Sequence, residues 1–323
     1  MPRKLLVTFK PKTTDRNLIS KILGDYIDII YLHEITSIKD LEDVEIILSG
    51  SGMDLENIIE KTLNLKFIQL LAAGADAVPF SKIRNNVIVA TNSGANAIPV
   101  AEHAIALLLS AAKRIVEHTV LMRNGVWKRR LFGDLIYGKK LGIIGFGNIG
   151  KEIAKRVKAF GMKILAINRS GKTNEKVDFI GDINSLNYVL ENSDYVILSL
   201  PLTKHTRGLI NRDKLNKMKK NAVLVNISRG GVIVEKDLYE HLKENPNFIA
   251  ALDVWWQYPE KDQEKCFQKY PFHKLNNVIM TPHIAGFTKE IREKVIESAL
   301  LNILKFIQTK HADNIVDKNE YLI

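Results

Sequence analysis

Residues 141–150 read Leu-Gly-Ile-Ile-Gly-Phe-Gly-Asn-Ile-Gly, with three glycines in the spacing G-x-G-x-x-G. The four residues 141–144 form an apolar run that is typical of a buried parallel strand. Residues 151–160 follow with apolar side chains at helical spacing, which predicts a helix. A strand, a glycine turn and a helix in this order predict a loop that holds a pyrophosphate.

Each glycine of this motif has its own physical reason. Gly145 permits a tight turn, Gly147 lets a pyrophosphate approach the backbone, and Gly150 lets the helix pack closely on the strand. The N-terminus of the helix after the glycines offers free N–H groups and a partial positive charge to the phosphates. On the glycines alone, an ordinary strand-to-helix turn remains an equal alternative.

Length and composition indicate a globular protein. A chain of 323 residues suggests about two domains, and 46% hydrophobic with 26% charged residues excludes a disordered chain. No apolar run reaches the ~18 residues needed to span a bilayer, and the N-terminal stretch does not have the pattern of a secretory signal. The single Cys266 cannot form an internal disulfide, so we expect a reducing, cytoplasmic location.

The net charge of +11 is consistent with binding of nucleic acid, acidic lipid or an anionic ligand, or with a solvated lysine-rich surface. Lysines are spread along the chain, and the densest run, 214–220, is typical of the outer face of a helix. No helix-turn-helix, zinc-finger or aromatic-plus-basic RNA signature accompanies them. We therefore expect a lysine-rich solvated surface, with neither nucleic acid nor membrane as a partner.

Short apolar runs alternate with helical stretches along nearly the whole chain, which predicts an α/β fold with two doubly wound parallel sheets. The predicted strands are 5–9, 27–31, 44–48, 66–70 and 87–90, then 141–144, 163–167, 195–198, 222–227, 248–252 and 278–281. The predicted helices are 17–23, 55–63, 151–160, 186–191, 213–218, 235–242 and 289–308, together with a long helix from Val100 to about Met122. That length suggests a helix that bridges two domains or lies in a dimer interface.

The residues after the second strand of the glycine unit favour one nucleotide over another. NAD-binding sites usually place Asp or Glu about 20 residues past the glycines, on the ribose 2′-OH. Here Asn168 occupies that place, beside Arg169 and Ser170. Because Arg and Ser can hold a 2′-phosphate that a carboxylate would repel, we expect NADP rather than NAD. The alternative is that Arg169 only stacks on adenine or faces water.

Four polar segments follow predicted strands at their carboxyl ends, where ligands bind in open α/β sheets. An Arg at one end, Arg229, can bind a carboxylate in a forked geometry, and a His at another, His283, can exchange a proton near neutral pH. Taken singly, each has a plain alternative as a surface cation or a turn histidine. The segments are 201–203, 226–231, 252–254 and 281–286.

Together these segments resemble the D-2-hydroxyacid dehydrogenase family over nearly the whole chain. The matching blocks are 145–150, 201–206, 226–230 and 281–286, and residues 100–103 resemble the start of that family's interdomain helix. The resemblance implies a Rossmann nucleotide-binding domain, 99–286, inserted into a flavodoxin-like catalytic domain, 1–98 with 287–323. It also implies reduction of 2-oxo acids by a nicotinamide hydride.

The same resemblance assigns roles to residues. Arg229 binds the carboxylate and polarises the carbonyl, and His283 is the general acid for reduction. Ala73, Gly74 and Asn96 resemble substrate contacts of the family. The cofactor contacts it implies are Gly145, Gly147, Asn148, Ile149, Gly150, Asn168, Arg169, Ser170, Leu200, Pro201, Thr206, Ile227, Ser228, Asp253, Ala285 and Gly286.

One position departs from the family pattern. A Glu that pairs with the catalytic His normally precedes the Pro after Asp253, but here Tyr258 precedes Pro259. A carboxylate favours the imidazolium, whereas a phenol only hydrogen-bonds it, so we expect His283 to lose its proton at a lower pH than in typical members. Glu260 is a weaker candidate for the missing partner. Formate dehydrogenases that resemble this family carry a neutral Gln there, which keeps a formate-like substrate open.

The sequence therefore predicts an NAD(P)-dependent dehydrogenase that acts on a small 2-oxo acid such as glyoxylate or hydroxypyruvate, and it suggests a homodimer. A rival hypothesis is a dinucleotide-sensing regulator on the same fold, although the presence of both Arg229 and His283 argues against it. Neither His103 nor His118 has ligand partners at the usual spacing, so we expect no metal and interpret both as helix residues.

Overall fold

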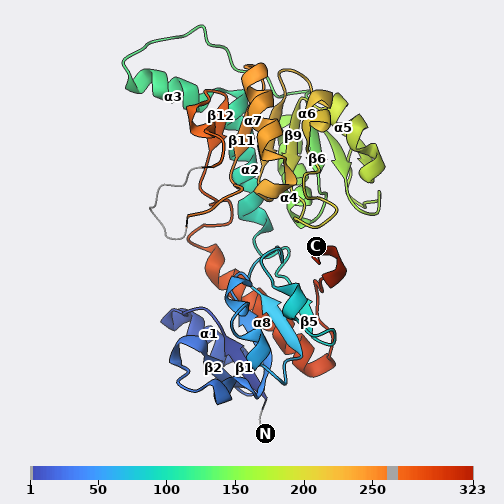
Figure 1. The fold of residues 1–323 in the computed structure, drawn as a ribbon. Coiled ribbons are helices and arrows are strands. Elements are labelled where there is room, and N and C mark those ends of the chain that lie inside the picture. Colours follow the sequence, from blue (N-terminus) through green and yellow to red (C-terminus); the bar gives the residue numbers. More distant parts are fainter. Residues whose placement is uncertain (1–2, 260–267, 323) are drawn as a thin grey trace. The chain divides into compact units, whose positions relative to one another are not determined.

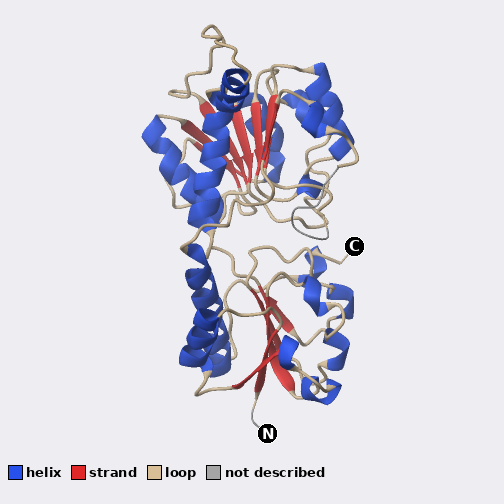
Figure 2. Ribbon diagram, turned by 90° about the vertical axis from the view of Figure 1, so that its left-hand side faces the viewer, coloured by secondary structure: helices blue, strands red, loops and turns tan. Residues whose placement is uncertain are grey.

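The computed structural model describes residues 3–259 and 268–322 (Figure 1). The chain divides into two compact units, each with its own sheet. Unit 1 contains Met1–Asn96 and Phe287–Ile323, and unit 2 contains Ala97–Gly286. In each unit helices flank the strands on both sides (Figure 2), which confirms the predicted α/β class.

Unit 1 has five parallel strands in the order β2-β1-β3-β4-β5, the flavodoxin-like arrangement. The central strands are almost wholly buried on both faces, as their largely apolar sequences predict. Helices α1 and α8 pack against each other, and α8 also packs on β4. The elements are β1 (Lys4–Val7), α1 (Thr13–Leu23), β2 (Asp28–Tyr31), β3 (Val44–Ser49), β4 (Phe67–Leu70), β5 (Ile88–Ala90) and α8 (Ile291–Thr309).

The helix predicted at 55–63 is wrong. The structure has two short 3₁₀ turns there, Met53–Leu55 and Ile59–Lys61. Of the apolar residues in this stretch, Leu55, Ile58 and Ile59 are buried, whereas Leu63 is exposed. However, the Thr62 hydroxyl donates a hydrogen bond to the carbonyl of Ile59 (2.7 Å), which closes the turn instead of letting a helix continue.

Unit 2 has seven parallel strands in the order β12-β11-β10-β9-β6-β7-β8. The order reverses between β6 and β9, which is the switch point where doubly wound sheets bind ligands. The strands are β6 (Lys140–Ile144), β7 (Lys163–Ile167), β8 (Phe179–Gly181), β9 (Tyr195–Leu198), β10 (Val223–Asn226), β11 (Ile249–Leu252) and β12 (Val278–Met280). The helices are α2 (Ala97–Ala112), α3 (Ile115–Arg123), α4 (Asn148–Val157), α5 (Leu186–Asn192), α6 (Arg212–Lys217) and α7 (Glu235–Glu244).

The sheet of unit 2 carries a separate hydrophobic core on each face. Ile143 belongs to the core beneath α2 and α4, and its neighbour Ile144 belongs to the core beneath α5, α6 and α7. This alternation is what a strand buried on both sides requires. Strand β8, which the sequence did not predict, is a three-residue edge strand whose first two residues are only half-buried.

The long helix predicted from Val100 to Met122 is wrong as a single element. The structure has two helices, and Arg114 between them adopts a left-handed backbone (φ 51°). A returning segment ends the first helix, because the Asp134 N–H donates to the carbonyl of Ala112 (2.7 Å). The first helix is largely buried, whereas the second has no buried residue, so only the first is held by a core. None of the described helices has the length and apolar character required to cross a membrane.

Candidate active site

The glycine turn after β6 has the geometry that the motif predicts at two positions. Gly145 has φ of 104°, and a Cβ there would lie 2.6 Å from the carbonyl of Ser199. A Cβ on Gly150 would lie 2.7 Å from the carbonyl oxygen of Gly145. Any side chain at either position would force apart the turn, the helix α4 and the end of β9.

Gly147 differs, because a Cβ there would meet no protein atom within 4 Å. Gly147 and Asn148 are exposed, Ile149 is half-buried, and together they start helix α4. The N–H groups of a first helical turn have no partner inside the helix and carry a partial positive charge. The open space in front of them therefore suits a phosphate group, which is the fit that a dinucleotide requires here.

The turn after β7 holds the residues expected to select the nucleotide. Asn168 donates from Nδ2 to the carbonyl of Lys172 (2.8 Å), and the Ser170 hydroxyl lies 3.3 Å from Asn168 Oδ1. These contacts fold the turn back on itself. Arg169, Ser170 and Lys172 are all exposed at its surface. Two cations and a hydroxyl on one tight turn form an arrangement that can bind a phosphate.

The loop after β9 is closed by its own hydroxyl groups. Thr206 Oγ1 donates to the carbonyl of Pro201 (2.6 Å) and accepts from the N–H of Thr203 (2.8 Å). Leu200 packs against the core. The Thr206 side chain thus shapes the loop, and this loop lies beside the glycine turn through the contact of Gly145 with residues 199–200.

The loop that carries Arg229 is built on a fully buried side chain. Asn226 Oδ1 accepts from the N–H (3.0 Å) and the hydroxyl (2.7 Å) of Ser228, and its Nδ2 donates to the carbonyl of Arg229 (3.0 Å). Ile227 between them is buried. Arg229 is half-buried and donates from Nη1 to the carbonyl of Ser228 (2.8 Å). A Cβ on Gly230 would lie 2.3 Å from the backbone of Trp255, so this loop presses directly on the segment after β11.

His283 lies in the loop after β12 and has a left-handed backbone with φ of 58°. That conformation is strained for a residue other than glycine and persists only when its surroundings hold it. Asp253 stabilises this conformation through hydrogen bonds with residues on both sides of His283. Its carboxylate accepts from the Thr281 hydroxyl (2.6 Å), the Ile284 N–H (2.9 Å) and the Ala285 N–H (3.0 Å).

Burial alone would raise the pKa of Asp253, but the hydrogen bonds from His103, Thr281 and the two backbone N–H groups outweigh it and hold the pKa below its usual value. Asp253 is therefore a fully buried carboxylate that stays ionised. The sequence placed it near the nicotinamide. In the structure it also fixes the loop that carries His283, Ala285 and Gly286.

His103 of α2, which the sequence indicated only as a helix residue, is a member of this network. Its Nε2 lies 3.1 Å from Thr281 Oγ1 and 3.4 Å from Asp253 Oδ1. Because the Thr281 hydroxyl gives its one proton to Asp253, Nε2 of His103 is the donor in this contact. His103 and Thr281 are 178 residues apart in the sequence, so no local pattern predicted their contact.

Tyr258 lies beside His283, with the two ring centroids 5.4 Å apart and tilted by 40°. Its hydroxyl accepts a hydrogen bond from the N–H of Trp255 (3.2 Å). The structure thus brings the loops of Arg229, Tyr258 and His283 together around residues 255–258. Glu260, considered as an alternative partner for His283, lies outside the described residues.

The predicted substrate contacts of unit 1 follow β4 and β5. Ala73 and Gly74 are half-buried in the loop after β4, and Asn92 bonds that loop through its N–H to the carbonyl of Ala72 (2.9 Å). Asn92 is itself fixed to α8 through the carbonyl of Val295 (2.7 Å). Asn96 Oδ1 is buried and makes no hydrogen bond within the described residues, so it has the capacity to accept one from a ligand.

Residues 105–285 match the profile of the D-isomer specific 2-hydroxyacid dehydrogenase family, NAD binding domain. The chain is 36% identical over 292 residues to a glyoxylate reductase of Pyrococcus furiosus, covering 87% of this chain and 84% of that protein. It is 35% identical over 321 residues to a D-3-phosphoglycerate dehydrogenase of Methanocaldococcus jannaschii, covering 97% of this chain but only 59% of that longer protein.

Among solved structures, the chain resembles a candidate formate dehydrogenase from Pyrobaculum aerophilum. The TM-score is 0.81 at 31% identity, and the match covers 99% of this chain and 100% of the other.

Proposed function

The chain belongs to the D-isomer specific 2-hydroxyacid dehydrogenase family, and from this premise we propose that it reduces a small 2-oxo acid, glyoxylate or hydroxypyruvate, through Arg229 and His283. It is an NAD(P)-dependent oxidoreductase that acts between the 2-hydroxy and 2-oxo forms of an acid. The observation that carries the proposal is the meeting of the Arg229 loop, Tyr258 and His283 around residues 255–258.

In this proposal the nicotinamide supplies the hydride, and the protein binds the acid and supplies the proton. The Arg229 guanidinium binds the carboxylate in a forked geometry and polarises the carbonyl. His283 donates a proton to the carbonyl oxygen as it gains charge, and it takes the proton back in the oxidation direction. The dinucleotide would lie over Gly147 and the start of α4, where the structure leaves open space.

We further propose that NADP is preferred over NAD, with Arg169 and Ser170 on the 2′-phosphate. The exposed turn that carries them supports this choice, since no acidic side chain stands at position 168. Arg169→Ala is expected to raise KM for NADPH by roughly tenfold while leaving KM for NADH unchanged. Lys155→Ala, an exposed cation of α4, is the matched control and should change neither value.

For unit 1 we propose that Ala73, Gly74 and Asn96 contact the substrate. The unpartnered Oδ1 of Asn96 supports this for one residue of the three. Substitution of Asn96 by Ala is expected to raise KM for the acid without changing the Kd of the reduced cofactor.

The proposed activity is tested by spectrophotometric assays of NADPH and of NADH oxidation. Each reduced cofactor is mixed with glyoxylate, with hydroxypyruvate, or with carbon dioxide, which is the oxidised form of formate. We expect oxidation of NADPH with glyoxylate or hydroxypyruvate by the wild type and its loss in His283→Ala. His311→Ala, an exposed histidine of unit 1, is the control that should retain activity. Cofactor binding without turnover on any acid, or turnover of formate with the oxidised cofactor alone, would contradict the proposal.

We also propose a homodimer, formed through the arm of residues 115–137 that reaches away from the sheet of unit 2 (Figure 1). Trp127 is 74% exposed and Phe132 is 78% exposed, which is unusual for large apolar side chains of a monomer. The other exposed apolar residues of the arm are Ile115, Val116, Val120, Met122, Val126, Leu135 and Tyr137.

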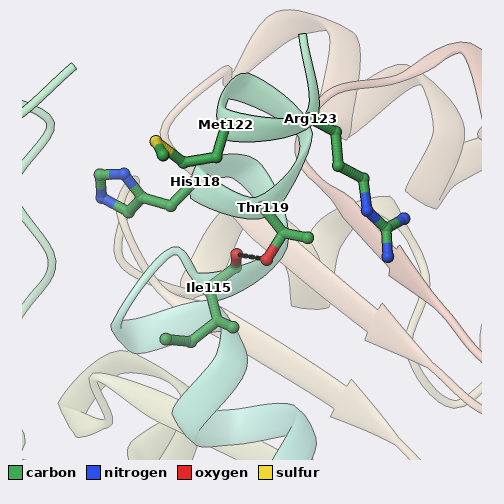
Figure 3. A pocket seen from close by; sticks show the side chains of 5 residues that line it. All are labelled: Ile115, His118, Thr119, Met122 and Arg123. Atoms are coloured by element: carbon green, nitrogen blue, oxygen red, sulfur yellow. Dashed lines mark hydrogen bonds between the residues drawn. The ribbon is translucent and has the colours of Figure 1, made fainter. Parts of the chain in front are cut away.

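The arm carries the exposed rings of Trp127 and Phe132, and it also has a hollow. The hollow lies on α3 and is lined by Ile115, His118, Thr119, Met122 and Arg123 (Figure 3). An interface between two identical copies needs one self-complementary patch, and projecting rings beside an apolar hollow meet that need. We expect light scattering to give a dimer for the wild type and a monomer for the double variant Trp127→Ser with Phe132→Ser. The variant Leu63→Ser, which alters an exposed apolar side chain of unit 1, should stay dimeric.

A further inference from the structure

Two adjacent tryptophans, Trp255 and Trp256, follow β11, and their indole groups bond to different parts of unit 2. Both are half-buried, and each indole N–H donates one hydrogen bond to a backbone carbonyl. Trp256 donates to Ile233 (2.8 Å) and stacks on the buried ring of Phe272, with centroids 5.3 Å apart. Trp255 instead donates to Thr281 (2.9 Å), the residue that precedes Pro282 and His283.

Trp255 is also in contact with the other two parts of the site. Its backbone is so close to Gly230 that any Cβ there would lie 2.3 Å away, which places it directly against the loop of Arg229. Its N–H donates to the hydroxyl of Tyr258 (3.2 Å), and the Tyr258 ring lies against His283. Trp255 therefore reaches His283 by two routes, through Thr281 and through Tyr258.

Trp255 therefore contacts the loop of Arg229 and the loop of His283, and within its own segment it bonds Tyr258. Thr281 is bonded at each of its polar groups: its N–H to Leu252, its hydroxyl to Asp253, and its carbonyl to the indole of Trp255. The indole bond connects Thr281 to Trp255, whose backbone packs against Gly230 in the loop of Arg229. Without it, Thr281 remains tied to the strand β11 and to Asp253, whose N–H donates to the carbonyl of Asn226 (3.0 Å), but it loses its bond to the segment that packs on Gly230 of the Arg229 loop.

We propose that Trp255 is a positioning residue for the reaction, and that its indole N–H and backbone set the placement of the proton donor His283 relative to the carboxylate-binding Arg229. This inference rests on the proposed function, because it assumes those roles for the two residues. Proton transfer and hydride transfer need both ends of the acid held at once, and a shift of about 1 Å in such a geometry can lower a rate by roughly a hundredfold. Trp256 makes no hydrogen bond to Thr281 or Tyr258 among the described residues, and its indole is held by Ile233 and Phe272 instead.

The two tryptophans form a matched pair for the test. Trp255→Phe and Trp256→Phe each remove one indole N–H bond to a backbone carbonyl and keep an aromatic ring. We expect Trp255→Phe to lower kcat on the 2-oxo acid by roughly ten- to a hundredfold, with the Kd of NADPH unchanged. We expect Trp256→Phe to keep kcat within about twofold of the wild type, even where its Tm falls as much as that of Trp255→Phe.

A second variant keeps the test decisive if Trp255→Phe does not fold. Tyr258→Phe removes only the hydroxyl that accepts from the Trp255 N–H and leaves the ring beside His283. It should lower kcat and change the pH dependence of kcat, with the Kd of NADPH unchanged. Equal losses of kcat in Trp255→Phe and Trp256→Phe, or wild-type kcat in both Trp255→Phe and Tyr258→Phe, would overturn the inference. A wild type without turnover on any 2-oxo acid would instead refute the proposed function, so the two failures are distinguishable.

Discussion

Replacing Asp253 by Asn tests whether one buried carboxylate holds the His283 loop. In the wild type, Oδ1 accepts from the Thr281 hydroxyl and the Ile284 N–H, and Oδ2 accepts from the Ala285 N–H. An amide keeps one acceptor oxygen, so its best orientation leaves its own NH₂ group facing the N–H of Ala285. One charge-assisted bond is lost and a buried donor is left unpaired, at about 1–3 kcal/mol each.

We therefore expect Asp253→Asn to lower the free energy of unfolding of unit 2 by about 3 kcal/mol. All three tryptophans, Trp127, Trp255 and Trp256, lie in unit 2, so tryptophan fluorescence during denaturant unfolding follows that unit. The activity should fall as well, because the strained backbone of His283 (φ 58°) loses the contacts that maintain it. Glu191→Gln, which alters an exposed ion pair with Lys217 in the same unit, is the control and should change stability by less than about 0.5 kcal/mol.

The pH dependence gives a second check on the same variant. Because the pKa of Asp253 is lowered in the folded state, its contribution is fully present above the unfolded value of about 4 and is lost as the pH falls through the folded value. The difference between wild type and Asp253→Asn should thus be constant from about pH 8 to pH 5 and shrink below about pH 4. A variant within about 0.5 kcal/mol of the wild type at neutral pH would refute the reasoning.

Three further predictions concern single side chains of unit 2. Tyr258→Glu places a carboxylate beside His283, so the basic limb of the pH profile for reduction should move to higher pH, and an unmoved limb would refute a role for this position. Burial lowers the pKa of His241, so below about pH 6.5 the unfolded state binds a proton that the folded state does not. The free energy of unfolding should therefore decline as the pH falls below about 6.5, and His241→Leu should remove much of that decline. The hydroxyl of Tyr195 is buried without a partner among the described residues, so Tyr195→Phe should raise the free energy of unfolding by about 1 kcal/mol, and a loss of stability would contradict this.

Much of the fold was predictable because the signals are local. The continuous apolar strands, the glycine spacing and the turn residues predicted two parallel sheets, and the structure and the family match confirm this class. The errors occur where a distant contact decides the outcome. Asp134 ends the helix at Ala112, and Thr62 closes a turn where the apolar spacing predicted a helix. Edge strand β8 has three residues and too little burial to show a pattern.

The chemistry of the site was only partly predictable. Arg229 and His283 could be proposed from the sequence because their strand-end positions and residue types suit binding of a carboxylate and transfer of a proton. The supporting contacts were not, because they join residues far apart in sequence: His103 to Thr281 across 178 residues, and Trp255 to Thr281 across 26. The contact of the Trp255 indole with Thr281 has no signature in the sequence and is visible only in three dimensions.

The most direct test of the central claim follows an isotope from the cofactor to the product. The wild type would be incubated with glyoxylate or hydroxypyruvate and NADPH that carries deuterium at the transferred position of the nicotinamide, and the product would be analysed by mass spectrometry. We predict a 2-hydroxy acid with deuterium on the carbon that bears the hydroxyl, formed by the wild type and not by His283→Ala or Arg229→Ala. If NADPH binds but no deuterated 2-hydroxy acid forms from either substrate, or if both variants form it as fast as the wild type, the account is wrong.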